Sequence, residues 1–110
     1  DAPDHCVISI FGEVIEGVAS NHQTRMIVEN RWEDGPHSLY ETEHKGQRLA
    51  FFHPGAGAPL SAALLEEVIA FGCRKFIVCG GCGVLDLDKE MAVGHLVVVS
   101  SAVRDEGTSR

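Results

Sequence analysis

Short runs of apolar or alternating residues, separated by polar and glycine-rich segments, follow one another along this chain of 110 residues. Most of these runs are too short for helices and have the length of β-strands. We expect strands at residues 6–11, 26–28, 39–44, 48–53, 76–79 and 96–103. Apolar residues at helical spacing predict helices at 12–19 and 60–71. Strands interleaved with helices predict the α/β class.

The middle of the chain predicts an antiparallel hairpin. Lys45-Gly46 is a two-residue turn between the runs 39–44 and 48–53, and the second run is the more apolar. A hairpin favours a mixed sheet over the all-parallel sheet of a flavodoxin-like fold, which is the competing arrangement. The preceding segment, 30–38, contains Asp34-Gly35-Pro36 and is expected to be a loop.

A strand–loop–helix–strand unit follows the hairpin. Residues 54–59 (Pro-Gly-Ala-Gly-Ala-Pro) lead into the helix, which Ser61 is expected to cap and Gly72 to end. The strand at 76–79 completes a βαβ unit with a right-handed crossover. A glycine loop at a helix N-terminus can hold an anion. This Gly-x-Gly-x-Pro pattern is neither a dinucleotide fingerprint nor a Walker loop, because the third glycine and the lysine of those motifs are missing.

The strongest candidate for a site is the segment from Lys75 to Gly83, which reads Lys-Phe-Ile-Val-Cys-Gly-Gly-Cys-Gly. Its apolar part predicts a buried strand, and glycines dominate the residues after Cys79. Glycine lets a ligand come close to the main chain, and ligands of open α/β sheets bind beyond the carboxyl ends of the strands. The alternative is a tight turn that needs glycine only for its conformation. The local pattern leaves both interpretations open.

Composition and charge exclude some functions. The net charge of −7 and the sequence pI near 5.2 argue against a nucleic-acid partner, which requires a basic surface. The sequence contains no apolar run long enough to span a membrane, and its first residues lack the pattern of a signal peptide. These observations predict a cytoplasmic protein without a membrane partner. The length predicts one domain at most.

Cysteines and histidines are the remaining candidates for chemistry. Cys79 and Cys82 form a C-x-x-C pattern, but no helix is expected to begin there to lower a thiol pKa. No set of four ligands has the spacing of a known zinc site. We therefore expect reduced thiols that pack and line a pocket, with no metal. Among the histidines, His53 is the candidate for ligand contact, because it ends a strand beside the glycine loop.

Three segments, taken in order, resemble the nucleoside phosphorylase / uridine phosphorylase superfamily. They are residues 55–72, 75–83 and 93–109. The resemblance implies a three-layer α/β/α sandwich around a mixed, partly barrelled sheet, in dimers that often assemble into hexamers. It also implies a pentosyltransferase that exchanges the N-glycosidic bond of a purine or pyrimidine nucleoside for a bond to phosphate. Inorganic phosphate would then be the co-substrate, with no cofactor.

The resemblance assigns substrate binding to the residues that follow the strand at 76–79. Gly80 and Gly81 would help to hold phosphate through their backbone N–H groups. Cys82 and Gly83 would lie beside the base. These roles are carried over from the family, position by position.

Two positions depart from the pattern of phosphorolytic members. An arginine usually stands where this chain has Val78, and serine or threonine commonly stands where it has Gly81. Both changes remove phosphate ligands. If phosphate binds, another arginine must supply the charge, and the candidates are Arg31, Arg104 and Arg110. Arg31 is the best match for an arginine that a neighbouring subunit contributes in the family.

Three functions therefore stay open. The first is a nucleoside phosphorylase, and the second is a nucleosidase of the same fold, in which water is the nucleophile. The third is a non-catalytic α/β binding module. The family's chain is much longer, and its ribose-gripping Glu-Met-Glu-type stretch and its acid for the leaving base lie downstream. Residues 1–110 are thus expected to be the N-terminal part of one domain, inactive alone, with the catalytic residues in the remainder.

Overall fold

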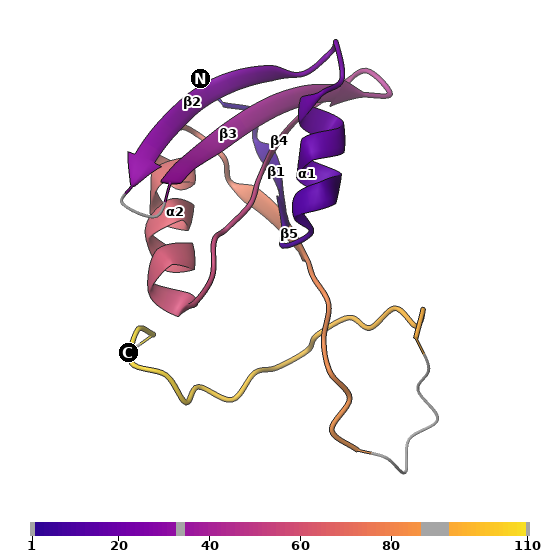
Figure 1. Ribbon diagram of the computed structural model, residues 1–110, viewed down its shortest axis with the longest axis vertical. Coiled ribbons are helices and arrows are strands. Elements are labelled where there is room, and N and C mark those ends of the chain that lie inside the picture. The colour runs from indigo at the N-terminus through magenta and orange to yellow at the C-terminus, as the bar shows by residue number, and fades with distance from the viewer. Residues whose placement is uncertain (1, 33–34, 87–92, 110) are drawn as a thin grey trace.

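The computed structural model describes residues 2–32, 35–86 and 93–109 of the chain. Within these residues, a sheet of five strands has the order β2-β3-β4-β1-β5 (Figure 1). The strands are β1 (His5–Ser9), β2 (Arg25–Trp32), β3 (Gly35–His44), β4 (Gln47–Phe52) and β5 (Lys75–Cys79). The helices are α1 (Gly12–Ala19) and α2 (Ala58–Ala70).

The sheet is mixed, as the hairpin predicted. The strand β3 pairs antiparallel with both β2 and β4, whereas β1 pairs parallel with both β4 and β5. Lys45 and Gly46 have φ values of 51° and 79°, as in the two-residue type I′ turn that matches the twist of paired strands. An all-parallel, flavodoxin-like sheet is therefore wrong for this chain. The carboxyl ends of β4, β1 and β5 lie at one edge, where α/β sheets bind ligands.

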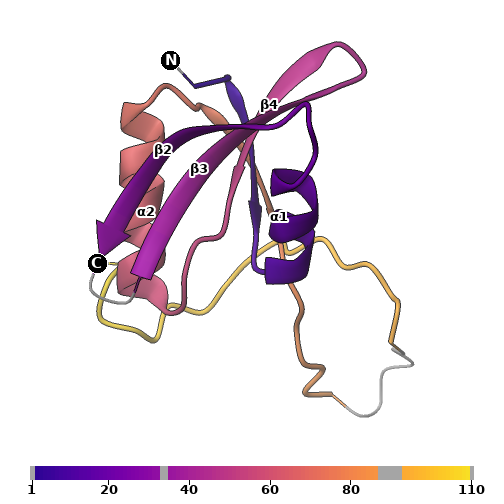
Figure 2. The ribbon, with the colours of Figure 1, turned by 45° about the horizontal axis from the view of Figure 1, so that its top comes forward.

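One helix packs on each face of the sheet, which gives three layers (Figures 1 and 2). The α2 residue Leu64 is buried in one cluster with Phe52 of β4. On the opposite face, Ile15 of α1 and Phe51 of β4 line the same small hollow. Phe51 and Phe52 point to opposite faces because side chains alternate along a strand. The predicted α/β class and α/β/α layering are confirmed.

The helix α2 ends as predicted but begins differently. Gly72 has φ +118°, and the N–H groups of Gly72 and Cys73 donate to carbonyls of the last helical turn at 3.0 and 3.3 Å. This is a Schellman motif, which requires a left-handed residue. The expected cap at Ser61 is wrong, because Gly57 occupies the N-cap position. The Ser61 hydroxyl instead donates to the Pro54 carbonyl at 3.1 Å.

The antiparallel part of the sheet is longer than the sequence indicates. The strand β2 continues to Trp32 and β3 begins at Gly35, so the expectation of a loop at 30–38 is wrong. Residues 33 and 34 lie outside the described residues. Backbone hydrogen bonds between β2 and β3 override the local turn preference of glycine and proline, because strand propensity depends strongly on tertiary context.

Two expectations for the last third of the chain are also wrong. The strand β5 is an edge strand rather than a buried one, and its Ile77 and Val78 are 66% and 65% exposed. The apolar run 96–103 forms no strand, and Leu96 and Val98 are 100% and 94% exposed. Figure 1 shows the chain beyond β5 leaving the sheet as an extended segment. A strand needs a neighbour for its backbone hydrogen bonds, and this run pairs with no strand of the described sheet.

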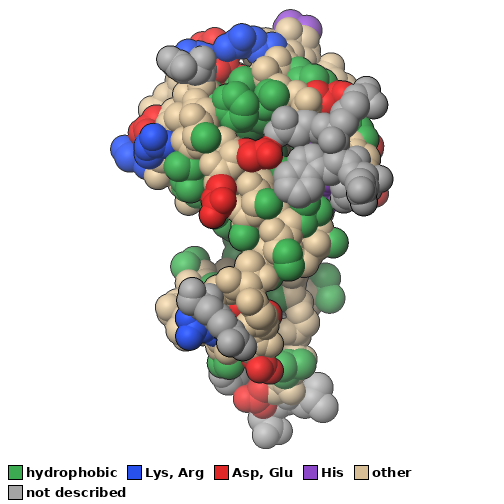
Figure 3. All heavy atoms as spheres, turned by 90° about the vertical axis from the view of Figure 1, so that its left-hand side faces the viewer, with side chains coloured by type: hydrophobic (Ala, Val, Ile, Leu, Met, Phe, Trp, Pro, Cys, Tyr) green, Lys and Arg blue, Asp and Glu red, His purple; other side chains and the backbone are tan. Residues whose placement is uncertain are grey.

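Charged side chains of the described residues are dispersed over one face of the molecule. Figure 3 looks onto the left-hand side of Figure 1, and the described Lys and Arg side chains on this face lie in separate small groups among acidic and apolar ones. On that face the described side chains form no continuous basic patch of the kind that binds a phosphate backbone. Among the described residues, no helix has the length and hydrophobicity needed to cross a bilayer.

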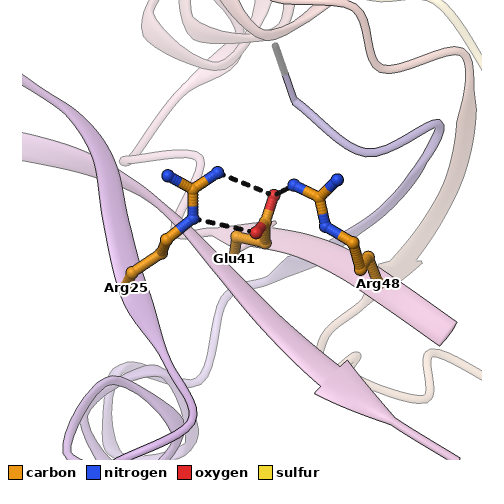
Figure 4. A network of polar contacts seen from close by, with 3 residues as sticks. All are labelled: Arg25, Glu41 and Arg48. Carbon is orange, nitrogen blue, oxygen red and sulfur yellow. Dashed lines mark hydrogen bonds and ion pairs between the residues drawn. The ribbon is translucent and has the colours of Figure 1, made fainter. Parts of the chain in front are cut away.

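One carboxylate is buried between the antiparallel strands. Glu41 of β3 is 7% exposed and lies between Arg25 of β2 and Arg48 of β4 (Figure 4). Arg25 donates to the two carboxylate oxygens at 2.9 and 3.4 Å, and Arg48 donates to one of them. The hydrogen bond from Arg25, with the further bond from Arg48, lowers the pKa of Glu41 from its ordinary value although desolvation opposes the shift. The network joins three neighbouring strands.

Acidification should weaken the fold through Glu41. A carboxyl group with a lower pKa in the folded state stabilises the fold above its unfolded-state pKa, and the contribution is lost as the pH falls through the folded-state pKa. We expect Glu41→Gln to remove about 1–2 kcal/mol of acid-dependent stability in urea unfolding measured from pH 7 down to pH 3. Glu43→Gln, at an exposed position of the same strand, is the control and should keep it. Wild-type acid dependence in Glu41→Gln would contradict this role.

Candidate functional site

Three loops meet at the edge where the parallel strands end. The strand β4 continues into the glycine-proline loop at 53–57, β1 into residues 10–11, and β5 into residues 80–83. The strand order places the loop of β1 between the other two loops. The edge therefore brings together segments that are far apart in the sequence, and two of them are rich in glycine.

His53 joins the loop of β4 to the loop of β1. Its ring Nε2 lies 3.0 Å from the carbonyl oxygen of Ile10, and the N–H of Gly55 donates to its Nδ1 at 3.0 Å. Gly55 has φ +74°, and a Cβ atom at this position would lie 2.3 Å from Cδ2 of Leu60. The turn therefore requires glycine on two grounds, conformation and space.

Ile10 joins the loop of β1 to β5. Its N–H donates to the carbonyl oxygen of Cys79 at 3.1 Å. Its side chain packs on Gly80, because a Cβ atom there would lie 2.9 Å from the Cδ1 of Ile10. A Cβ atom on Gly81 would meet only the Phe11 ring, at an ordinary 3.9 Å. The first glycine after β5 thus allows a close approach to residue 10.

Beyond Gly80 the loop is open. Gly81, Cys82 and Gly83 are exposed, and no atom lies within 4 Å of the position of a Cβ on Gly83. Residues 80–86 form no regular element or turn. A hollow of about 450 Å³ is lined by residues 10–14, and a second of about 350 Å³ extends to His53. Neither hollow is lined by residues 80–83. The ligand-binding role of this loop therefore stays a prediction, which rests on an exposed glycine backbone that can present N–H groups to an anion.

The cysteines divide into two pairs. Cys6 and Cys73 are buried in the core, and desolvation is the main cause that raises the pKa of each thiol. Cys79 and Cys82 are exposed at the candidate site, and all four are free thiols. In the described residues that follow Cys79 no helix begins, as the sequence indicated. The described residues contain no cluster of three or more histidine, cysteine or acidic side chains that could hold a metal ion.

The described residues place no arginine at the open loop. Arg31 lies in β2, where its backbone pairs opposite Pro36, and its side chain is outside the described part. Arg104 lies in the C-terminal segment, where residues 104–107 surround a hollow of their own. Arg110 is outside the described residues. Val78 pairs with Ile8, which is buried in the same cluster as Leu64 of α2. Val78 therefore points to the face of the sheet that α2 covers, and it is largely exposed.

Sequence reasoning missed the role of Ile10. It predicted a strand at 6–11, but β1 ends at Ser9, and the next residue contacts both His53 and Gly80. The only local signal was the position of Ile10 directly after an apolar run. Its importance depends on the strand order, because β1 separates β4 from β5.

The fold and this edge define an α/β protein of the kind that binds ligands at the ends of parallel strands. The chain belongs to the phosphorylase superfamily, whose family model matches residues 4–110. It is 32% identical over 87 residues to a guanosine phosphorylase of Halorubrum lacusprofundi, which covers 79% of this chain and 34% of the relative. It is 35% identical over 77 residues to a uridine phosphorylase of Thermococcus kodakarensis, which covers 67% of this chain and 27% of that relative.

Two solved structures of phosphorylases show the same fold. A purine nucleoside phosphorylase of Toxoplasma gondii, in complex with immucillin-H, superposes with a TM-score of 0.61 at 21% identity and covers 76% of this chain and 32% of its own. A uridine phosphorylase of Vibrio fischeri ES114, complexed with 6-hydroxy-1-naphthoic acid, gives a TM-score of 0.62 at 18% identity and covers 76% and 33%. The chain therefore spans about a third of the length of the proteins that it matches.

Proposed function

We propose that the protein to which this chain belongs is a nucleoside phosphorylase, which transfers the pentosyl group of a purine or pyrimidine nucleoside to inorganic phosphate. The observation that carries the proposal is the open glycine loop at 80–83, beyond the carboxyl ends of parallel strands in a chain of the phosphorylase superfamily. The guanosine and uridine phosphorylases among its relatives support this class of reaction.

The chemistry explains why an open backbone is useful. The N-glycosidic bond breaks as positive charge develops on the pentose, and a phosphate oxygen forms the new bond to the anomeric carbon. An anion held against the sugar stabilises that charge in the transition state. Backbone N–H groups of Gly80 and Gly81 would hold phosphate oxygens, and Cys82 and Gly83 would adjoin the base. The group that assists the leaving base would come from the rest of the protein.

Phosphate also requires a cationic partner. We assign this role to Arg31 of a neighbouring subunit in a homo-oligomer, with Arg104 as the second candidate. A guanidinium group binds phosphate through two parallel hydrogen bonds and brings a positive charge, which the neutral N–H groups of a backbone loop do not provide. The proposed protein is cytoplasmic, uses phosphate as co-substrate and needs no other cofactor.

A nucleosidase is the second candidate, and the residues Val78 and Gly81 favour it. Neither offers a side-chain ligand to phosphate, and a hydrolytic enzyme that uses water as nucleophile needs none. A non-catalytic binding module is the third. The 110-residue chain alone is expected to release no base, because the catalytic residues are expected outside it.

The three functions separate in one assay. The full-length protein is incubated with inosine or uridine, with and without phosphate, and base release is followed by absorbance. A phosphorylase releases base only with phosphate, so omitting phosphate should reduce the rate at least about 100-fold, to the level of the uncatalysed background. Equal rates in both conditions would contradict the proposal and establish the nucleosidase. Absence of release in both would favour the binding module.

A further inference from the structure

His53 has both ring nitrogens engaged within the protein. The N–H of Gly55 donates to Nδ1, so this nitrogen must carry a lone pair and no proton. The other ring nitrogen, Nε2, lies 3.0 Å from the carbonyl oxygen of Ile10, and a carbonyl can only accept. The two contacts are satisfied together only by the neutral ring with its proton on Nε2. Neither nitrogen is left over for a substrate.

The contacts of His53 continue to the candidate loop. Ile10, whose carbonyl the ring holds, donates its N–H to the Cys79 carbonyl at 3.1 Å and packs its side chain on Gly80. A continuous path of contacts thus runs from Gly55, through His53 and Ile10, to Gly80. It links the loop before α2 to the loop after β5, across the end of β1.

We propose that His53 is a positioning residue, which holds the two glycine loops at a fixed separation by fixing the carbonyl of Ile10 and the N–H of Gly55. The proposal rests on the proposed function, because the loop at 80–83 is where phosphate and nucleoside would bind. His53 does not touch the substrate. Its effect is on how well the loop backbones are arranged before the ligand arrives, and displacement by about 1 Å is enough to change rates and affinities strongly.

Substitutions can remove the two contacts separately in the full-length protein. Asn carries an acceptor near the place of Nδ1 and so can keep the bond from Gly55, whereas Gln carries a donor near the place of Nε2 and so can keep the bond to Ile10. His53→Leu loses both. His44→Leu, at the exposed end of β3 beside the hairpin turn, is the matched control. Urea unfolding and circular dichroism establish that each variant is folded.

Steady-state kinetics then test the role. We expect His53→Leu to raise KM for phosphate about 10-fold or more, with a smaller change in kcat, and His53→Asn and His53→Gln to give intermediate values. His44→Leu should match the wild type. If His53→Leu does not fold, the Asn and Gln variants decide. Folded variants of His53 with wild-type KM for phosphate would overturn the proposal.

Two NMR measurements decide the link independently of activity. The imidazole ¹⁵N shifts of His53 should report the proton on Nε2, and the amide of Gly55 should exchange slowly in the wild type and at least about 10-fold faster in His53→Leu. A proton on Nδ1, or unchanged exchange of Gly55, would overturn the link whatever the activity. A wild type with this tautomer and protection, but without phosphorolysis, would support the link between the loops and refute the proposed function.

Discussion

Replacing Gly55 with alanine is expected to destabilise the protein by about 2–5 kcal/mol. The residue has φ +74°, a conformation that costs an L-amino acid roughly 1–2 kcal/mol. A Cβ atom would also lie 2.3 Å from Cδ2 and 2.8 Å from Cγ of Leu60, and overpacking of this kind costs about 1–3 kcal/mol. Leu60 packs against the core cluster and cannot move away freely. Urea unfolding of the full-length protein measures the difference.

The controls for Gly55→Ala separate its two causes. Gly17→Ala adds the same methyl group inside α1, where nothing lies within 4 Å, and should stabilise the protein by about 0.5–1 kcal/mol. In a Leu60→Ala background the steric clash disappears, so Gly55→Ala should then cost only the conformational part, about 1–2 kcal/mol. A Gly55→Ala protein within about 0.5 kcal/mol of the wild type would show that this turn is not fixed as described.

Replacing Val78 with arginine is expected to lower KM for phosphate about 10- to 100-fold. The family resemblance implies an arginine at this position in phosphorolytic members. A hydrogen bond to a charged group contributes about 1.5–3 kcal/mol. Val78 is 65% exposed, so the longer arginine side chain has room within residues 1–110. It lies on the face of the sheet that α2 covers, and β1 separates its strand from β4, which continues into the loop at 53–57. Steady-state kinetics with varied phosphate measure the change.

The neighbouring residue provides a matched control. Ile77 is 66% exposed but pairs with Val7 and therefore points to the opposite face of β5. Ile77→Arg adds the same charge to the same strand and should leave KM for phosphate unchanged. Equal effects of the two substitutions would mean that only the added charge matters. No effect of Val78→Arg would mean that phosphate does not approach this end of β5.

Local sequence chemistry predicted the parts of the fold whose determinants are close in the chain. Lys45-Gly46 specifies a two-residue hairpin turn because glycine accepts the positive φ that this turn needs. Gly72 ends α2 for a similar reason, and the helical spacing of Leu64 and Val68 predicts the buried stripe of that helix. Each of these features depends on residues within a few positions of one another.

Other features depend on contacts between distant segments and could not be predicted in this way. The apolar composition of β5 resembles that of a buried strand, but its exposure depends on whether a strand pairs with its second edge. The strand order brings Ile10 between the two glycine loops, and neither neighbour is close to it in sequence. The glycines at 80–83 identified the candidate loop from sequence, whereas the bonds of His53 required the three-dimensional arrangement.

The fate of the pentose distinguishes phosphorolysis from hydrolysis. ³¹P NMR of the full-length protein with a nucleoside and inorganic phosphate distinguishes the two possible products. If the protein is a phosphorylase, we expect a pentose 1-phosphate signal that grows in step with the released base. Released base accompanied only by free pentose, with the phosphate signal unchanged, would contradict it.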